Sequence, residues 1–248
     1  ALKPLGQKPR LLVLVALNVL LSCAGAVGLA LLARRLRISP WPVVLLFLTF
    51  PTAVYQSALY TESLFLCLSL GSALCATPAE RSAPARWAPW VGGVLGCLAG
   101  LTRPQGILVA LFWLEPAWEA WQRRTPMGER LRTLVPVFAP FLGLAILALT
   151  LWRSIGAPLG FLGVQKHWAR EFSPLHLLSE AFRPWAYEGP PFDQVAFWLG
   201  LFLLPILWRR LPRSLALFGT ASVLLPLSTG TMLSFGRFLS VSFPHFLA

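Results

Sequence analysis

The chain has 248 residues, of which 56% are hydrophobic and only 12% are charged, and its mean hydropathy is +0.68. Soluble domains carry about 25% charged residues, so this composition excludes an ordinary soluble fold and predicts an all-α, polytopic integral membrane protein. The formal net charge of +12 would suggest nucleic acid in a soluble protein. Here the basic residues lie in short connections between apolar runs, which is typical of membrane topology and argues against a nucleic-acid partner.

Apolar segments recur along the whole chain and predict a single transmembrane domain over residues 1–248. They cover residues 11–33, 40–57, 59–76, 88–102, 105–121, 134–152, 195–208, 214–229 and 238–248. Several are shorter than the ~20 residues that a perpendicular helix needs. Broken helices are tolerated where protein or an aqueous cavity surrounds the freed backbone. We therefore interpret Pro51, Pro104, Pro205 and Pro226 as breaks around an internal cavity, with ordinary kinks as the alternative for the last two.

The first segment follows Lys3, Lys8 and Arg10 and has the look of a lipoprotein signal ending at Cys23. Its apolar character continues to Ala33 without a polar mature segment, which favours a transmembrane helix. The chain begins without Met and stops inside an apolar run, so we expect a fragment. Its four cysteines have no metal-ligand spacing, and no cofactor fingerprint is present. We therefore expect no metal, no disulfide and no cofactor.

Two short connections carry charge at membrane depth, where a charged side chain costs at least a few kcal/mol and by default marks a site. One contains Tyr60 and Glu62, and the other contains Arg103. Glu62 either orients a substrate hydroxyl or pairs with a cation as a structural partner. Arg103 and Arg237 suit a phosphate because the guanidinium fork binds it bidentately. Interfacial snorkelling is the alternative for both.

Orientation follows from the arginines in alternate connections. Residues 34–37, 81–86, 123–132 and 209–213 concentrate Arg, so the positive-inside rule places these connections in the cytoplasm. The extracytoplasmic side then receives residues 60–62, Arg103, a loop of about residues 153–194, and Arg237. Polar interruptions that converge on one face predict a site at the membrane surface.

The long loop contains Gln165, Trp168 and Arg170. Gln165 and Trp168 lie one turn apart if this stretch forms an interfacial helix. Trp168 is therefore a candidate for the site, whereas the other Trp residues near segment ends are typical of an interfacial belt.

Four stretches in this order resemble the PIG-V-type mannosyltransferases. Residues 50–65 (FPTAVYQSALYTESLF) are similar to the signature Pro...Tyr-(Thr/Ser)-Glu-(Ala/Ser)-Leu-Phe, and residues 102–106 (TRPQG) to Arg-(Ser/Pro)-x-Gly. Residues 165–170 (QKHWAR) resemble a Gln-x-x-Trp-x-Arg loop, and residues 237–244 an Arg-Tyr...Phe-Pro segment. The resemblance covers most of residues 40–248. The form of the motif at residues 102–106 is more similar to that of bacterial relatives.

This resemblance implies a glycosyltransferase of GT-C type, without a cofactor, that transfers mannose from a polyprenyl or dolichyl phosphate to a lipid-linked or other acceptor. Eukaryotic members act in the endoplasmic reticulum on the precursor of the GPI anchor; a bacterial relative would act in the plasma membrane, on the extracytoplasmic face. The substrate-binding residues that it implies are Tyr60, Arg103, Gln165, Trp168, Arg170 and Arg237, with Glu62 in a supporting catalytic role.

The family's Trp-Asp motif is absent from the chain, and Phe238 replaces a usual Tyr. We expect the motif upstream of Ala1, so the catalytic base would lie outside this fragment and the fragment alone would be inactive. Two other classes remain open. A transporter would bind a polar solute between broken helices and would show two corresponding halves, which we do not see. A non-catalytic membrane scaffold is the third possibility.

Overall fold

The computed structural model describes the chain except for residues 1–6, 79–84, 167–172, 174–181, 183–188 and 229. Within the described part every regular element is a helix, as the composition predicts. The elements are α1 (Gln7–Arg35), α2 (Pro40–Thr49), α3 (Val54–Ser57), α4 (Glu62–Ala76), α5 (Ala88–Thr102), the 3-10 helix η1 (Pro104–Ala110), α6 (Leu111–Gln122), α7 (Met127–Ile155), α8 (Gly160–Lys166), α10 (Pro191–Arg210), α11 (Arg213–Leu227), α12 (Phe235–Val241) and α13 (Pro244–Leu247).

Among the described helices, α1, α7 and α10 are long and apolar enough to cross a membrane. Helices α2, α4, α5 and α11 have only 10 to 15 residues, in line with the short apolar segments. Two of the predicted apolar segments are not single helices. Residues 40–57 divide into α2 and the four-residue α3, and residues 238–248 divide between α12 and α13. The region predicted as a loop, about residues 153–194, contains the last turn of α7, the short α8 and the start of α10.

Two of the four predicted proline breaks are correct. Phe50 and Arg103, which precede Pro51 and Pro104, are extended, with ψ of 133° and 152°. Proline disfavours the helical conformation of the residue before it, so α2 and α5 end at these points. Pro205 and Pro226 lie instead inside the continuous helices α10 and α11. A proline removes one helical hydrogen bond, but a full break in an apolar environment would leave several backbone groups without partners.

The most extensive helix pair is α5 with α7, and glycines allow their backbones to approach closely. A Cβ added to Gly100 would lie 2.1 Å from the carbonyl oxygen of Pro140, and one added to Gly143 would lie 1.9 Å from that of Cys97. Small residues at helix contacts are the usual means of close packing in membranes. On its other side α5 packs against α4, which in turn packs against α1.

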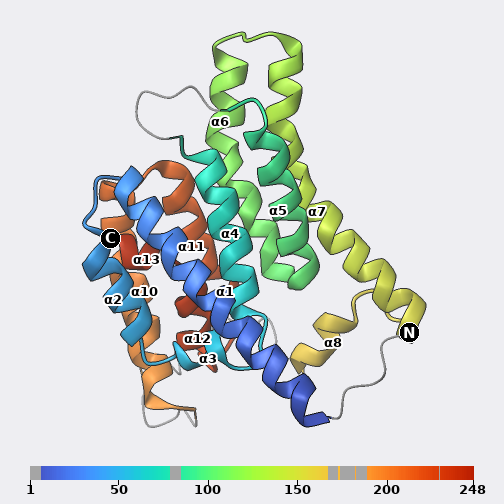
Figure 1. Cartoon of the computed structure of the whole chain (residues 1–248), viewed down its shortest axis with the longest axis vertical. Coiled ribbons are helices and arrows are strands. Elements are labelled where there is room, and N and C mark those ends of the chain that lie inside the picture. The colour runs from blue at the N-terminus through green and yellow to red at the C-terminus, as the bar shows by residue number, and fades with distance from the viewer. Residues whose placement is uncertain (1–6, 79–84, 167–172, 174–181, 183–188, 229) are drawn as a thin grey trace.

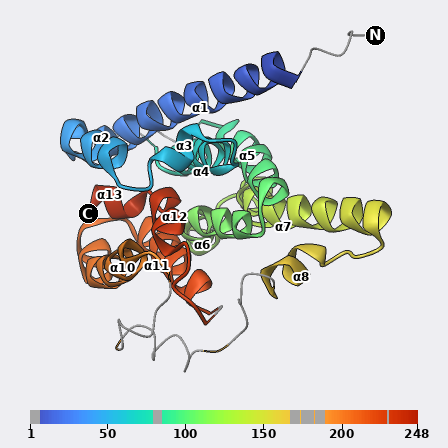
Figure 2. The ribbon, with the colours of Figure 1, turned by 90° about the horizontal axis from the view of Figure 1, so that it is seen from below.

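Figure 1 shows the two ends of the bundle at the top and at the bottom. The turn after α1, the end of α4, the start of α5, the α6–α7 turn and the α10–α11 turn lie at one end. The start of α4, the end of α5, and helices α3 and α12 lie at the other. Seen from below, α7 extends to the side opposite α10, α11 and α13 (Figure 2). Because α4 has 15 residues, the two ends are about 20 Å apart at a rise of 1.5 Å per residue.

Candidate functional site

Glu62 is the centre of the candidate site. It is the first residue of α4 and is completely buried. A carboxylate in the first turn is favoured by the positive end of the helix dipole, but that contribution alone does not stabilise a charge away from water. A buried carboxylate needs charged or hydrogen-bonding partners. Glu62 has two of them.

Arg103 is the first partner. Its Nη2 donates to Oε1 of Glu62 over 2.8 Å, and its guanidinium lies 5.3 Å from the centre of the Phe65 ring. The arginine side chain is 13% exposed. The extended conformation that Pro104 imposes on Arg103 ends α5 at this point, so the local sequence places the guanidinium beside the start of α4.

Arg237, on α12, is the second partner. Its Nε donates to the same oxygen of Glu62 over 2.5 Å. Its guanidinium lies 4.1 Å from the ring centre of Tyr60 and 5.2 Å from that of Tyr55. The two tyrosines pack edge to face with ring centres 5.4 Å apart. The side chain of Arg237 is 25% exposed, so this part of the cluster is the most open.

Asp193, in the first turn of α10, holds the turn that delivers Arg237. Its two carboxylate oxygens accept the backbone N–H groups of Ser234 (2.8 Å) and Gly236 (2.9 Å). Ser234 has a φ of +63°, a left-handed conformation that is uncommon for a residue with a side chain. Thr52 adds a hydrogen bond of 2.9 Å from its hydroxyl to the carbonyl of Gly236. The start of α12 is therefore fixed by side chains from α10 and from the turn between α2 and α3.

Two polar atoms of the cluster are buried without a hydrogen-bond partner among the described residues. They are Oε2 of Glu62 and Nη1 of Arg103. One is an acceptor and the other a donor. With two guanidinium groups and one carboxylate, the cluster of Glu62, Arg103 and Arg237 carries a formal charge of +1. Such an arrangement can bind an anion that also presents a hydroxyl group.

The structure therefore brings together four of the residues selected from the sequence: Tyr60, Glu62, Arg103 and Arg237. Gln165 lies in α8, but its side chain is outside the described part. Trp168 and Arg170 lie outside the described residues altogether. No group of three or more His, Cys, Asp or Glu side chains that could hold a metal ion occurs in the part of the chain that the structure describes.

Sequence reasoning missed Asp193 and Tyr55. Asp193 follows Gly-Pro-Pro-Phe at the start of an apolar segment, and an acid at that position is a signal for a helix start. Nothing local shows that its partners are backbone groups 41 and 43 residues away. Tyr55 lies within the motif that contains Tyr60, but its contact with Arg237 depends on the short helix α3.

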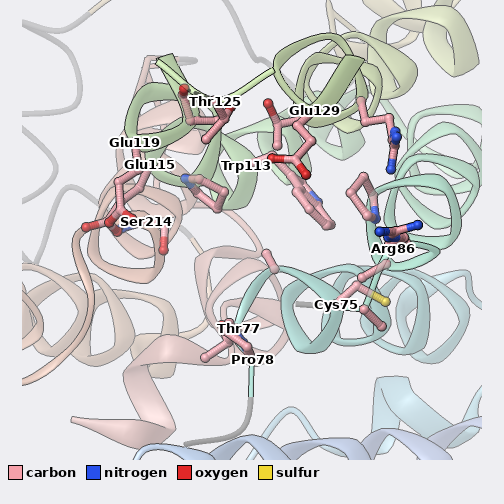
Figure 3. A pocket seen from close by; sticks show the side chains of 18 of the residues that line it. Cys75, Thr77, Pro78, Arg86, Trp113, Glu115, Glu119, Thr125, Glu129 and Ser214 are labelled. Atoms are coloured by element: carbon pink, nitrogen blue, oxygen red, sulfur yellow. Dashed lines mark hydrogen bonds between the residues drawn. The ribbon is translucent and has the colours of Figure 1, made fainter. Parts of the chain in front are cut away.

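The large cavity of the structure does not coincide with the predicted internal cavity beside the proline breaks. It has a volume of about 770 Å³ and lies at the opposite end of the bundle, between the ends of α4 and α6 and the starts of α5, α7 and α11 (Figure 3). Its walls carry charges of both signs. Arg123 pairs with Glu119 at 3.0 Å, and Glu115 accepts the backbone N–H of Ser214 over 3.4 Å.

Comparison of the chain with protein-family models, with curated proteins and with solved structures gives no match.

Proposed function

We propose that the chain belongs to a multi-pass membrane glycosyltransferase that takes mannose from a polyprenyl or dolichyl phosphate. The observation that carries the proposal is the buried Glu62 carboxylate shared by Arg103 and Arg237 at an end of the bundle. A lipid phosphate has its chain in the bilayer and its charge at the membrane surface. Cationic side chains at the ends of short helices suit such a donor. The order of the four sequence motifs adds independent support.

In this proposal Arg103 and Arg237 bind the phosphate that leaves. The acceptor hydroxyl oxygen forms a bond with the anomeric carbon of the sugar while the bond from that carbon to the phosphate oxygen breaks. The electron pair of the broken bond stays on the phosphate, where guanidinium groups stabilise the developing charge. The proton of the acceptor passes to a general base. Glu62, which already accepts two charged donors, is suited to orienting groups rather than to removing a proton.

The same proposal fixes an orientation. The turns rich in arginine would lie in the cytoplasm, as the positive-inside rule requires. Glu62, Arg103 and Arg237 would then lie at the extracytoplasmic or luminal face, in the bacterial plasma membrane or the endoplasmic reticulum. A lipid-linked or other glycan acceptor would reach the site from that side.

The substitution Arg103→Lys tests the phosphate site in membranes that carry the full-length protein. Lysine keeps the charge but cannot form the bidentate fork, so transfer of labelled mannose from a polyprenyl phosphate should fall at least about tenfold, or about 1.4 kcal/mol. Arg123→Lys, in the pair with Glu119 at the other end, is the matched control and should retain activity. Unchanged kinetics of Arg103→Lys would make Arg103 a structural anchor instead.

A further inference from the structure

The negative charge of Glu62 lowers the net positive charge of the phosphate site. This net charge affects the sugar donor and the lipid phosphate product differently, because the two carry different negative charges. Resting on the function proposed above, we propose that Glu62 makes the site select a phosphodiester with one negative charge over a phosphomonoester with two. The sugar donor is a phosphodiester. The lipid phosphate left after transfer is a phosphomonoester, which carries about −1.5 to −2 near pH 7.

The first step of the argument is the net charge. Arg103 and Arg237 both bind Oε1 of Glu62, so one of their two positive charges is already neutralised inside the site. The carboxylate is completely buried, so water does not contact it directly and screens its charge only weakly. A bound anion experiences the sum of all three charges, which is +1.

The second step compares attraction with desolvation. Removing an ion from water has a Born cost that rises with the square of its charge, so a dianion costs about four times as much as a monoanion. Attraction to a site with a charge of +1 only doubles. The second negative charge therefore gains less attraction in a site of +1 than in a site of +2, so removal of the Glu62 charge shifts the preference toward the dianion.

The third step concerns the two unpaired atoms. Nη1 of Arg103 is a buried donor and Oε2 of Glu62 is a buried acceptor, and neither has a hydrogen-bond partner among the described residues. On a phosphodiester that bears a sugar, Oε2 can accept a sugar hydroxyl. On a phosphomonoester the same oxygen faces additional negative charge with no proton to accept. Both effects weaken binding of the product and promote its release.

The experiment compares two soluble probes, farnesyl phosphate as the monoester and its methyl ester as the diester, by calorimetric titration of the purified protein in detergent at pH 8. The wild type should bind the diester at least about tenfold more tightly, or about 1.4 kcal/mol. Glu62→Gln, which keeps the shape and an acceptor oxygen, should lose or reverse this preference. Glu115→Gln, which changes a half-buried acid at the other end, should keep it.

A measurement on the wild type alone covers the case in which Glu62→Gln does not fold. Near pH 5 the monoester has lost most of its second charge, so its affinity should approach that of the diester, whose charge does not change. The inference would be wrong if the wild type bound the monoester more tightly at pH 8, or if wild type and Glu62→Gln preferred the diester to the same degree. Either result would still support a phosphate site. Binding of neither probe would overturn the phosphate site as well.

Discussion

At the scale of single residues, one oxygen atom organises the site. Oε1 of Glu62 accepts one hydrogen bond from Arg103 and another from Arg237, and these charged contacts allow a carboxylate to be buried at the start of α4. Buried ion pairs contribute little net stability when they are complete, but loss of one partner leaves an uncompensated charge. The three residues should therefore respond unequally to substitution.

We expect Glu62→Ala to destabilise the protein by several kcal/mol, about 3–5 by comparison with other broken buried pairs. Two arginines then lose their shared counterion. Arg237→Ala should have a smaller effect, because Glu62 keeps Arg103 and the side chain of Arg237 is partly exposed. Thermal unfolding in detergent would measure both. Glu119→Ala, in an exposed pair, should change little, since such pairs contribute at most about 0.5 kcal/mol. Equal losses for Glu62→Ala and Glu119→Ala would show that the cluster is not a buried ion network.

The local sequence indicates three of the four clustered residues because each interrupts an apolar segment: Tyr60 and Glu62 in one connection, and Arg103 in another. Their mutual contacts could be anticipated only through the alternation of crossings. The support from Asp193 could not be predicted, since it acts through backbone N–H groups and leaves no residue pattern at residues 234–236. Only the three-dimensional fold brings Asp193 close to the turn at residues 234–236.

At the scale of elements, α12 is the least independent part of the site. It has only seven residues, and helices of that length are not stable alone. Its start has a left-handed Ser234 and is held by Asp193 and Thr52. A Cβ on Gly236 would lie 2.5 Å from the ring of Phe192, so this turn is also closely packed.

Asp193→Asn tests whether Asp193 positions Arg237 for binding. The amide can accept only one of the two N–H groups, and the unmet donor costs about 1–3 kcal/mol. We expect a modest loss of thermal stability together with weaker binding of the methyl ester of farnesyl phosphate, because Arg237 is no longer held over Glu62. Asp193→Glu keeps both oxygens and should recover part of the binding. A loss of stability with unchanged binding would show that the turn does not control Arg237.

The predicted proline breaks are correct at the two prolines that have polar residues nearby, and wrong at the two that do not. Pro51 lies between Thr49 and Thr52, and Pro104 between Thr102 and Gln105, so other groups can satisfy the freed backbone there. Pro205 and Pro226 have mainly apolar neighbours. The helix continues through them because no alternative partners are at hand. The break at Pro51 divides residues 40–57 as predicted, whereas the division of residues 238–248 between α12 and α13 was not predicted.

At the scale of the whole molecule, the charge distribution separates the two ends. Trp87, Trp90, Trp118 and Trp121 are exposed near the arginine-rich turns, as in an interfacial aromatic belt. Arg130 lies 5.4 Å from the ring of Trp121. The Glu62 cluster lies at the other end.

Cysteine labelling in intact cells would test the orientation. We expect Ser154→Cys, at the end of α7, to react with a membrane-impermeant maleimide added outside. Arg124→Cys, in the α6–α7 turn, should react only after the membrane is permeabilised. The unsubstituted protein, with its exposed Cys23, gives the background. Labelling of both from the same side would contradict the separation of the ends, and a reversed result would invert the orientation.

The sequence separations within the cluster also have a consequence for biosynthesis. Glu62 and Arg103 are 41 residues apart, whereas Glu62 and Arg237 are 175 apart. A ribosome therefore delivers the acid and its first base within one helical hairpin, α4 with α5, long before α12 is made. The hairpin can enter the bilayer as a neutral pair, which lowers the penalty of inserting either charge alone. The positive charge that suits the site to a phosphate arrives with α12, after the helices from α1 to α11 have been made.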